Sequence, residues 1–183
     1  MILPSQTIAA TRVKCPETGA LRQIVEPFVT RSIQSGASYG LSHAGYDIRI
    51  RQDLVLGSGD FRLASSIEHF VMPDDLLGLV KDKSTWARRG LSVYNTVIEP
   101  GWHGFLTLEL VNHGHELLIF RRGDPIAQVI FQRLELPTAT PYAGKYLGQE
   151  DAPVPAREEG DLAAGTPPSP PHHTPTPSQG RES

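Results

Sequence analysis

The 183-residue chain has only one cysteine, Cys15, so it can form neither an intrachain disulfide nor a cysteine-rich zinc site. No apolar run approaches the ~20 residues that span a bilayer, and the N-terminus lacks the apolar segment of a signal peptide. The net charge of -3 argues against a chain-wide basic surface, although it leaves room for a local basic pocket. We therefore expect a cytoplasmic protein that binds neither membranes nor nucleic acid.

Several nucleotide-binding and metal-binding signatures are also missing. The chain has no GxxxxGK[ST] phosphate loop, no GxGxxG after a strand, and no HxE paired with PCxxC, the signature of zinc nucleobase deaminases. His113 and His115 stand two apart beside a glycine, which favours a hairpin loop over a metal site. We predict no metal-ligating residues.

The composition changes near residue 150. Residues 151–183 hold eight of the sixteen prolines and no aromatic residue, so they cannot bury enough apolar surface to offset their ordering entropy. We predict a disordered Pro-rich tail over 151–183. Its "PPSPPHHTPTP" run also suits a proline-recognition domain, but a solvated tail is the commoner outcome. Residues 1–150 suit one domain.

That domain has mainly β signals. Short alternating or apolar segments end at Gly, Pro, Asn or Asp, which predicts a sandwich or barrel-like β domain. The segments are 46–57, 69–73, 76–81, 91–100, 104–114, 116–123 and 125–136. The glycine-rich stretch 57–61 has the composition of a turn. Two short helices are expected, one near residues 5–12 and one with Ser84 as N-cap and Gly90 as its stop.

The second helix carries groups that suit phosphate. In "KSTWARRG", Ser84 and Arg88 are four residues apart and share one face. Lys83, Thr85 and the helix N-terminus add a cation, a hydroxyl and free amides. From spacing alone, a capped surface helix with a solvated arginine explains the pattern better.

The stretch "GFLTLELV" places a carboxylate inside a predicted strand. Alternation puts Glu109 on one face with Phe105 and Thr107, while the leucines 106, 108 and 110 form the opposite, core face. Glutamate is depleted in strands, so the residue is either exposed on an edge strand or part of a pocket wall or interface. Alternation does not choose between these readings.

Taken together, the motifs are similar to those of a known family. "EPFVTRSIQSGASYGLSHAGYDIRI", "KSTWARRGL", "VIEPGWHGFLTLELVNHG", "RRGDPIAQVIFQRLE" and "GKYLGQ" follow the order of corresponding elements in the dCTP deaminase family, part of the dUTPase-like superfamily. The chain resembles that family over nearly all of residues 1–150. The resemblance implies a mainly β fold, a dUTPase-like distorted β-barrel or β-clip with a few short helices.

The resemblance also implies an activity, the zinc-independent deamination of dCTP to dUTP and ammonia, in the metabolism that feeds dUMP and dTTP synthesis. Glu109 matches the family's catalytic glutamate, which takes a proton from the attacking water and delivers it to the ring and the leaving amine. Ser84 and Arg88 match the serine and arginine that position that water. We expect a dry pocket to raise the pKa of Glu109.

Further residues match substrate contacts of the family. Lys83, Thr85, Lys145 and Gln149 correspond to triphosphate ligands, with Gln128 and Tyr142 as weaker matches. Trp102 corresponds to an aromatic residue near sugar and base, although packing behind its turn explains it nearly as well. Glu99 stands where the family has an aspartate that meets the 3'-hydroxyl. The resemblance implies no cofactor beyond Mg²⁺ carried by the nucleotide, and a homotrimer or hexamer with active sites at subunit contacts.

Two departures keep other activities open. Glu99 replaces the aspartate, and the loop "SVYNTVIE" is shorter than the family pattern, so dCMP or a 5-substituted cytosine nucleotide remains an alternative substrate. A bifunctional dCTP deaminase and dUTP diphosphatase is a second alternative. A pure dUTPase is disfavoured because the chain lacks the glycine-rich C-terminal motif of those enzymes. A non-enzymatic nucleotide-binding regulator is the third.

Overall fold

The computed structural model describes residues 1–158, and its regular structure is almost entirely β. The two helices among these residues have six and four residues, so the predicted mainly β fold with a few short helices is confirmed. In chain order the elements are α1 (Ser5–Ala10), β1 (Arg12–Lys14), β2 (Leu21–Gln23), β3 (Val25–Glu26), β4 (Ser32–Gln34), β5 (Ala37–Leu41), β6 (Tyr46–Arg49), β7 (Leu54–Leu56), β8 (Phe61–Val71), β9 (Leu76–Asp82), α2 (Ser84–Ala87), β10 (Leu91–Val93), β11 (Val97–Ile98), β12 (His103–Asn112), β13 (Leu118–Phe120) and β14 (Pro125–Arg133).

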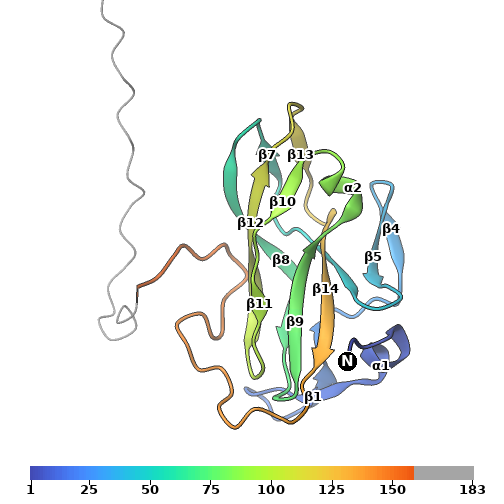
Figure 1. The fold of residues 1–183 in the computed structure, drawn as a ribbon, viewed down its shortest axis with the longest axis vertical. Coiled ribbons are helices and arrows are strands. Elements are labelled where there is room, and N and C mark those ends of the chain that lie inside the picture. Colours follow the sequence, from blue (N-terminus) through green and yellow to red (C-terminus); the bar gives the residue numbers. More distant parts are fainter. Residues whose placement is uncertain (159–183) are drawn as a thin grey trace, which may run out of the picture.

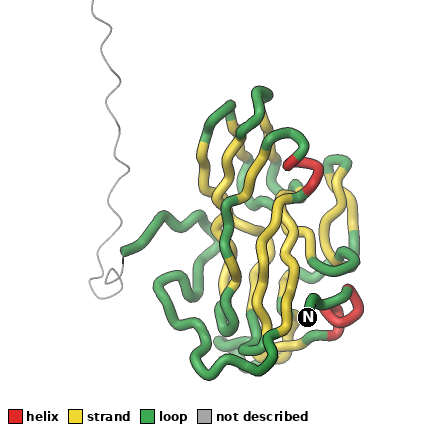
Figure 2. Tube along the Cα trace, viewed as in Figure 1, coloured by secondary structure: helices red, strands yellow, loops and turns green. Residues whose placement is uncertain are grey.

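Two antiparallel sheets build the molecule. One has the order β10-β12-β8-β3 and the other the order β11-β9-β14-β6-β5-β4, while β1-β2 and β13-β7 form two-stranded ribbons. Strands β9 and β14 run side by side along the length of the molecule, as Figure 1 shows. Figure 2 shows that long loops gather along one side of these strands. Antiparallel sheets joined by tight turns fit the spacing of the predicted strands.

The central strand β12 alternates between core and cavity. Leu106, Leu108 and Leu110 are buried in the hydrophobic core, whereas Thr107 and Glu109 are half-buried on the other face. This is the phase predicted from the sequence, and it follows from the two-residue repeat of a strand.

A β-bulge interrupts the pairing of β12 with β8. The register shifts between Phe105 and Thr107, and the Leu106 N–H donates to the hydroxyl of Ser66 at 2.9 Å. Ser66 is fully buried and donates its own hydrogen to the Glu68 carbonyl at 2.7 Å. A buried serine therefore satisfies the amide that the bulge leaves without a strand partner.

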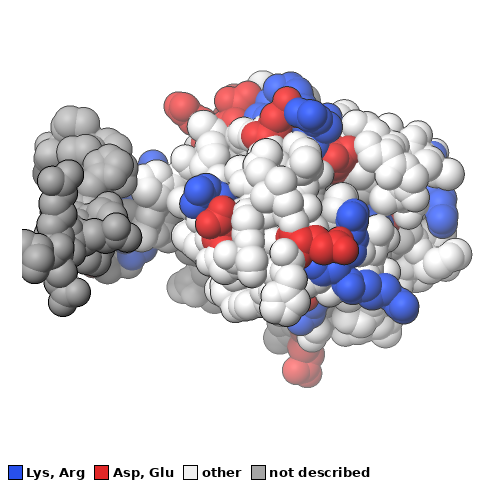
Figure 3. All heavy atoms as spheres, turned by 90° about the horizontal axis from the view of Figure 1, so that it is seen from above, with Lys and Arg blue, Asp and Glu red and all other residues white. Residues whose placement is uncertain are grey.

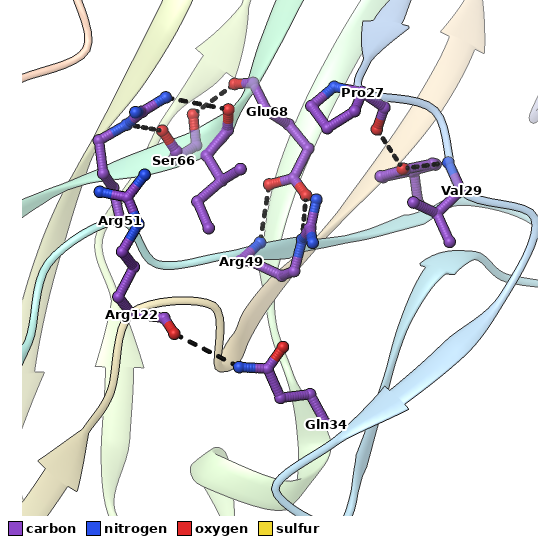
Figure 4. A network of polar contacts seen from close by, with 10 residues as sticks. Pro27, Val29, Gln34, Arg49, Arg51, Ser66, Glu68 and Arg122 are labelled. Atoms are coloured by element: carbon purple, nitrogen blue, oxygen red, sulfur yellow. Dashed lines mark hydrogen bonds and ion pairs between the residues drawn. The ribbon is translucent and has the colours of Figure 1, made fainter.

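A buried ion pair joins β6 to β8. The Glu68 side chain is fully buried, and its carboxylate accepts hydrogen bonds from the backbone N–H of Arg49 at 2.8 Å and from Arg49 Nε at 2.7 Å (Figure 4). A buried carboxylate is tolerated only with such partners. The sequence pattern predicted β8 only from residue 69 onward, because a charge inside 61–68 weakened the apolar signal.

The structure differs from the prediction in the N-terminal third, where five strands, β1 to β5, were not predicted. Each has only two to five residues and carries little alternation of its own, so pairing with neighbours creates them. The helix α2 also differs, since Lys83 is its N-cap and no side chain caps it. The prediction of Ser84 as N-cap was wrong, whereas Gly90, with φ of 92°, lies where the helical segment stops, as predicted.

The chain beyond β14 folds back along the domain, and we call residues 137–157 the C-terminal arm. Past residue 150, Asp151 pairs with Arg51 at 3.0 Å and the Val154 N–H donates to the Thr107 hydroxyl at 3.0 Å. The first residues of the predicted Pro-rich tail thus contact the domain, since prolines also suit an extended, docked chain. The rest of that predicted tail, residues 159–183, lies outside the described residues.

The surface and the helices carry two further observations. Lysine and arginine side chains are interspersed with aspartate and glutamate on the face shown in Figure 3, rather than forming one continuous patch. Among residues 1–158, no helix is long and apolar enough to cross a membrane.

Candidate active site

A cavity of about 500 Å³ lies against the half-buried face of β12, and we call it the Glu109 cavity. Its volume falls in the range of small-molecule sites in proteins. Three segments form its walls: β12 with its partner β8, the chain from β10 to Trp102, and the C-terminal arm. The lining residues are Phe61, Leu63, Asn95, Thr96, Val97, Ile98, Glu99, Trp102, Leu106, Thr107, Glu109, Tyr142, Tyr146, Gln149, Val154 and Ala156.

Glu109 faces this cavity without a polar partner. Its carboxylate makes no hydrogen bond or ion pair with any residue from 1 to 158, although its backbone is held on β12. Burial raises the pKa of Glu109 above its ordinary value. A half-buried, unpaired carboxylate of raised pKa is suited to accept and return a proton.

The C-terminal arm closes one side of the cavity. The Phe105 N–H on β12 donates to the Gln149 carbonyl at 2.9 Å, and Trp102 Nε1 donates to the Tyr146 carbonyl at 2.6 Å. Trp102 is largely buried, so it serves both packing and the cavity wall. The structure thus gathers five of the predicted site residues around one cavity: Glu99, Trp102, Glu109, Tyr142 and Gln149.

A second cavity, of about 330 Å³, contains other predicted residues, and we call it the Lys83 cavity. Lys83, Ser84 and Gln128 line it, and it shares no lining residue with the Glu109 cavity. Asp47, which is buried, accepts from Lys83 Nζ at 2.8 Å and from Gln128 Nε2 at 3.0 Å. Lys83 is therefore held in a buried ion pair, and Asp47 orients both side chains.

The remaining predicted residues lie outside these two cavities. Thr85 and Arg88 are exposed on or next to the single turn of α2. Lys145 lies on the arm, with its ammonium 5.6 Å from the centre of the Tyr146 ring and its carbonyl accepting from Arg157 at 2.8 Å. Within one chain, the predicted catalytic residues Ser84, Arg88 and Glu109 are therefore not gathered into one cavity.

Sequence reasoning missed Asp47, Asn95 and Tyr146. Asp47 had a signal, a carboxylate within an alternating strand, and Tyr146 stands inside the "GKYLGQ" motif. Asn95 had none, because an asparagine between two strands is the ordinary residue of a turn. Among residues 1–158, no group of three or more His, Cys, Asp or Glu side chains could hold a metal ion.

Comparison with known proteins identifies relatives of this chain. A family model described as dCTP deaminase-like matches residues 45–134. A dCTP deaminase of Campylobacter fetus is 35% identical over 166 residues, covering 73% of this chain and 89% of its own length. A dCTP deaminase of Pyrococcus horikoshii is 31% identical over 140 residues, covering 68% of this chain and 85% of its own.

Among solved structures, similar chains are dUTPases. That of EIAV has a TM-score of 0.48 at 22% identity, covering 57% of this chain and 87% of its own. That of phage phi11 of S. aureus has a TM-score of 0.47 at 18% identity, covering 68% of this chain and 92% of its own. The sequence relatives, through their identity and coverage, decide the family: the chain belongs to the dCTP deaminase family.

Proposed function

We propose that this protein catalyses the hydrolytic deamination of dCTP to dUTP and ammonia. Water adds to C4 of the cytosine, the C4–N4 bond breaks, and N4 leaves as ammonia while its place is taken by the water oxygen. The observation that carries the proposal is Glu109, an unpaired and half-buried carboxylate on the wall of a nucleotide-sized cavity, in a chain of this family.

Glu109 is the proton shuttle in this proposal. It accepts one proton from the attacking water and passes it to ring nitrogen N3, then takes the second proton from the C4 hydroxyl of the adduct and delivers it to the departing amine. Its burial supports the role, because a pKa raised towards neutrality favours both uptake and release of a proton. Ser84 and Arg88 hold the water and stabilise the charge that develops on it.

We divide the substrate contacts into those to the base and sugar and those to the triphosphate. Trp102 and Glu99, on the wall of the Glu109 cavity, meet the base and deoxyribose. Lys83, Thr85, Gln128, Tyr142, Lys145 and Gln149 are assigned to the triphosphate. Mg²⁺ enters this proposal only as the complex of the nucleotide triphosphate.

The proposal also requires more than one copy of the chain. Glu109 faces one cavity and Ser84 another, and the two cavities share no residue. A closed symmetric oligomer resolves this division, because one subunit's α2 can lie against the Glu109 cavity of its neighbour. We assign a homotrimer, with one active site at each of its three subunit contacts.

The test is incubation with dCTP, dCMP, 5-methyl-dCTP, dUTP and the corresponding ribonucleotides, with ammonia, pyrophosphate and product measured by chromatography. We expect ammonia and dUTP from dCTP, and loss of both in Glu109→Gln. Pyrophosphate release together with dUMP would replace the simple deaminase by a bifunctional enzyme. Absence of ammonia from every cytosine nucleotide would refute the proposal and favour a nucleotide-binding regulator.

A further inference from the structure

The loop after β10 crosses the middle of β12 at the height of Glu109. Strand β10 pairs with β12 as far as Val93, opposite Leu110, and the Tyr94 N–H then donates to the Glu109 carbonyl at 2.9 Å. Beyond Tyr94 the backbone turns away, so β10 cannot supply the next rung of the ladder. Without another partner, the Glu109 N–H and the Thr107 carbonyl would remain unpaired at the cavity wall.

The side chain of Asn95 supplies this missing rung. Its Nδ2 donates to the Thr107 carbonyl at 2.5 Å, and its Oδ1 accepts from the Glu109 N–H at 3.3 Å. A primary amide presents a donor and an acceptor side by side, as the backbone of a neighbouring strand does. Asn95 therefore replaces one residue of strand β10 with its side chain.

A second side-chain contact holds the loop, but away from the cavity. The Tyr94 hydroxyl lies 2.9 Å from His113 Nε2, on an exposed part of the surface. Asn95, in contrast, lines the Glu109 cavity, as does its neighbour Thr96. The contact that bears on the site is thus the amide of Asn95 and not the phenol of Tyr94.

We propose that Asn95 is the positioning residue for Glu109, fixing through its amide the backbone from which the catalytic carboxylate projects; this inference rests on the proposed function. Only asparagine meets both requirements at this distance. Aspartate keeps an acceptor for the Glu109 N–H but loses the donor to Thr107, and glutamine is longer by one methylene. The Asn95 amide spans the distance between the loop and the backbone of Thr107 and Glu109.

The inference predicts a specific kinetic defect. In Asn95→Ala the Glu109 backbone loses its support, and misplacement of a catalytic group by about 1 Å costs roughly 10- to 100-fold in rate. We expect kcat for dCTP to fall by that factor while KM changes less than about threefold, because binding groups elsewhere are intact. Tyr94→Phe is the matched control, since it removes the other anchor of the same loop, and it should retain wild-type kcat.

Asn95→Asp provides a second, nearly isosteric variant. It should lower kcat less than Asn95→Ala, because Asp retains the acceptor for the Glu109 N–H. It should also move the acid limb of the kcat profile to higher pH, since a second carboxylate in the cavity disfavours ionisation of Glu109. The other titratable side chains that line the cavity are Glu99, Tyr142 and Tyr146, and they are unchanged in every variant.

The outcomes separate this inference from the proposed function. Wild-type protein that releases no ammonia from dCTP refutes the function itself. Active wild type together with wild-type kcat in Asn95→Ala refutes only the positioning role. A raised KM at unchanged kcat makes Asn95 a substrate contact instead, and an equal loss in Tyr94→Phe assigns the effect to the loop as a whole. If Asn95→Ala unfolds, Asn95→Asp with wild-type kcat and an unmoved acid limb overturns the inference.

Discussion

At the residue scale, the proposed chemistry depends on the position of Glu109 on its strand. Alternation puts it opposite Leu108 and Leu110, so its carboxylate faces a cavity and not the core. Burial there raises its pKa, and the described residues offer no cation to offset that burial. The protein thus keeps a carboxylate in an environment that disfavours its charge, as sites for proton transfer often do.

The first prediction concerns pH. Because Glu109 must be ionised to take a proton from water, kcat should fall as the pH drops through its raised pKa, above the ordinary range of a glutamate. Steady-state kcat between pH 4.5 and 9 measures this limb. Glu109→Gln should lose the limb and roughly 100- to 10,000-fold of the activity. A limb that persists in residual Glu109→Gln activity would assign it to another group.

The same shift has a consequence for stability. A folded-state pKa of Glu109 above its unfolded-state value means that the folded protein binds the carboxyl proton more tightly. The contribution of this proton to the free energy of unfolding is therefore fully present at low pH. It is lost as the pH rises through the folded-state pKa of Glu109. Glu109→Gln carries no charge to bury and should unfold at the same or a higher temperature than wild type at pH 8. Destabilisation of this variant would mean that the carboxylate has a partner in the assembly.

At the element scale, three segments cover β12 in succession. Strand β10 pairs with its C-terminal end, the loop containing Asn95 holds its middle, and the arm reaches its N-terminal end through Gln149. The contact of the arm with β12 depends on glycine at position 104. A Cβ there would lie 2.7 Å from the Gln149 backbone nitrogen, and the φ of Gly104 is 139°. Backbone that approaches this closely requires glycine.

The second prediction follows from that approach. In Gly104→Ala the arm should leave β12, taking Gln149 and Lys145 away from the substrate, and KM for dCTP should rise about tenfold or more. Trypsin should then cleave after Lys145 faster than in wild type. Gly57→Ala is the control, because the nearest atom to a Cβ there lies at an ordinary 3.4 Å and the backbone is unstrained. If KM and the rate of tryptic cleavage were unchanged in Gly104→Ala, substrate binding would not depend on the contact between Gly104 and the arm.

At the scale of the whole molecule, the separation of the two cavities is the main feature. Glu109 lines one and Ser84 the other, while Arg88 is exposed on the surface. In the proposed homotrimer, Arg88 enters the site of a neighbouring subunit, where its donors meet the reacting water.

The third prediction tests this shared site. Arg88→Ala and Glu109→Gln should each be inactive alone. Co-expressed in equal amounts, they should regain about a quarter of wild-type activity, since each site needs the intact residue from each of two subunits and half of each type is intact. Size-exclusion chromatography with light scattering should report a trimer throughout. No recovery in confirmed mixed oligomers would place both residues of a site on one chain.

The sequence alone determined the local features of this protein. The two-residue repeat set which face of β12 meets the core, glycines and prolines marked the turns, and five ordered motifs indicated the family. These properties depend on neighbours along the chain, so a pattern can report them. Short strands such as β1 to β5 escaped prediction because pairing, and not their own residues, makes them strands.

Only the tertiary structure decided what meets what. It brought Asp47 to Lys83 across 36 positions of sequence, and Thr107 to the arm across 47. It also placed Glu109 and Ser84 in separate cavities, left Arg88 outside both, and made the Asn95 side chain a rung of β12. Contacts between distant segments depend on how the sheets fold and pack, and that geometry is not written in any single stretch of sequence.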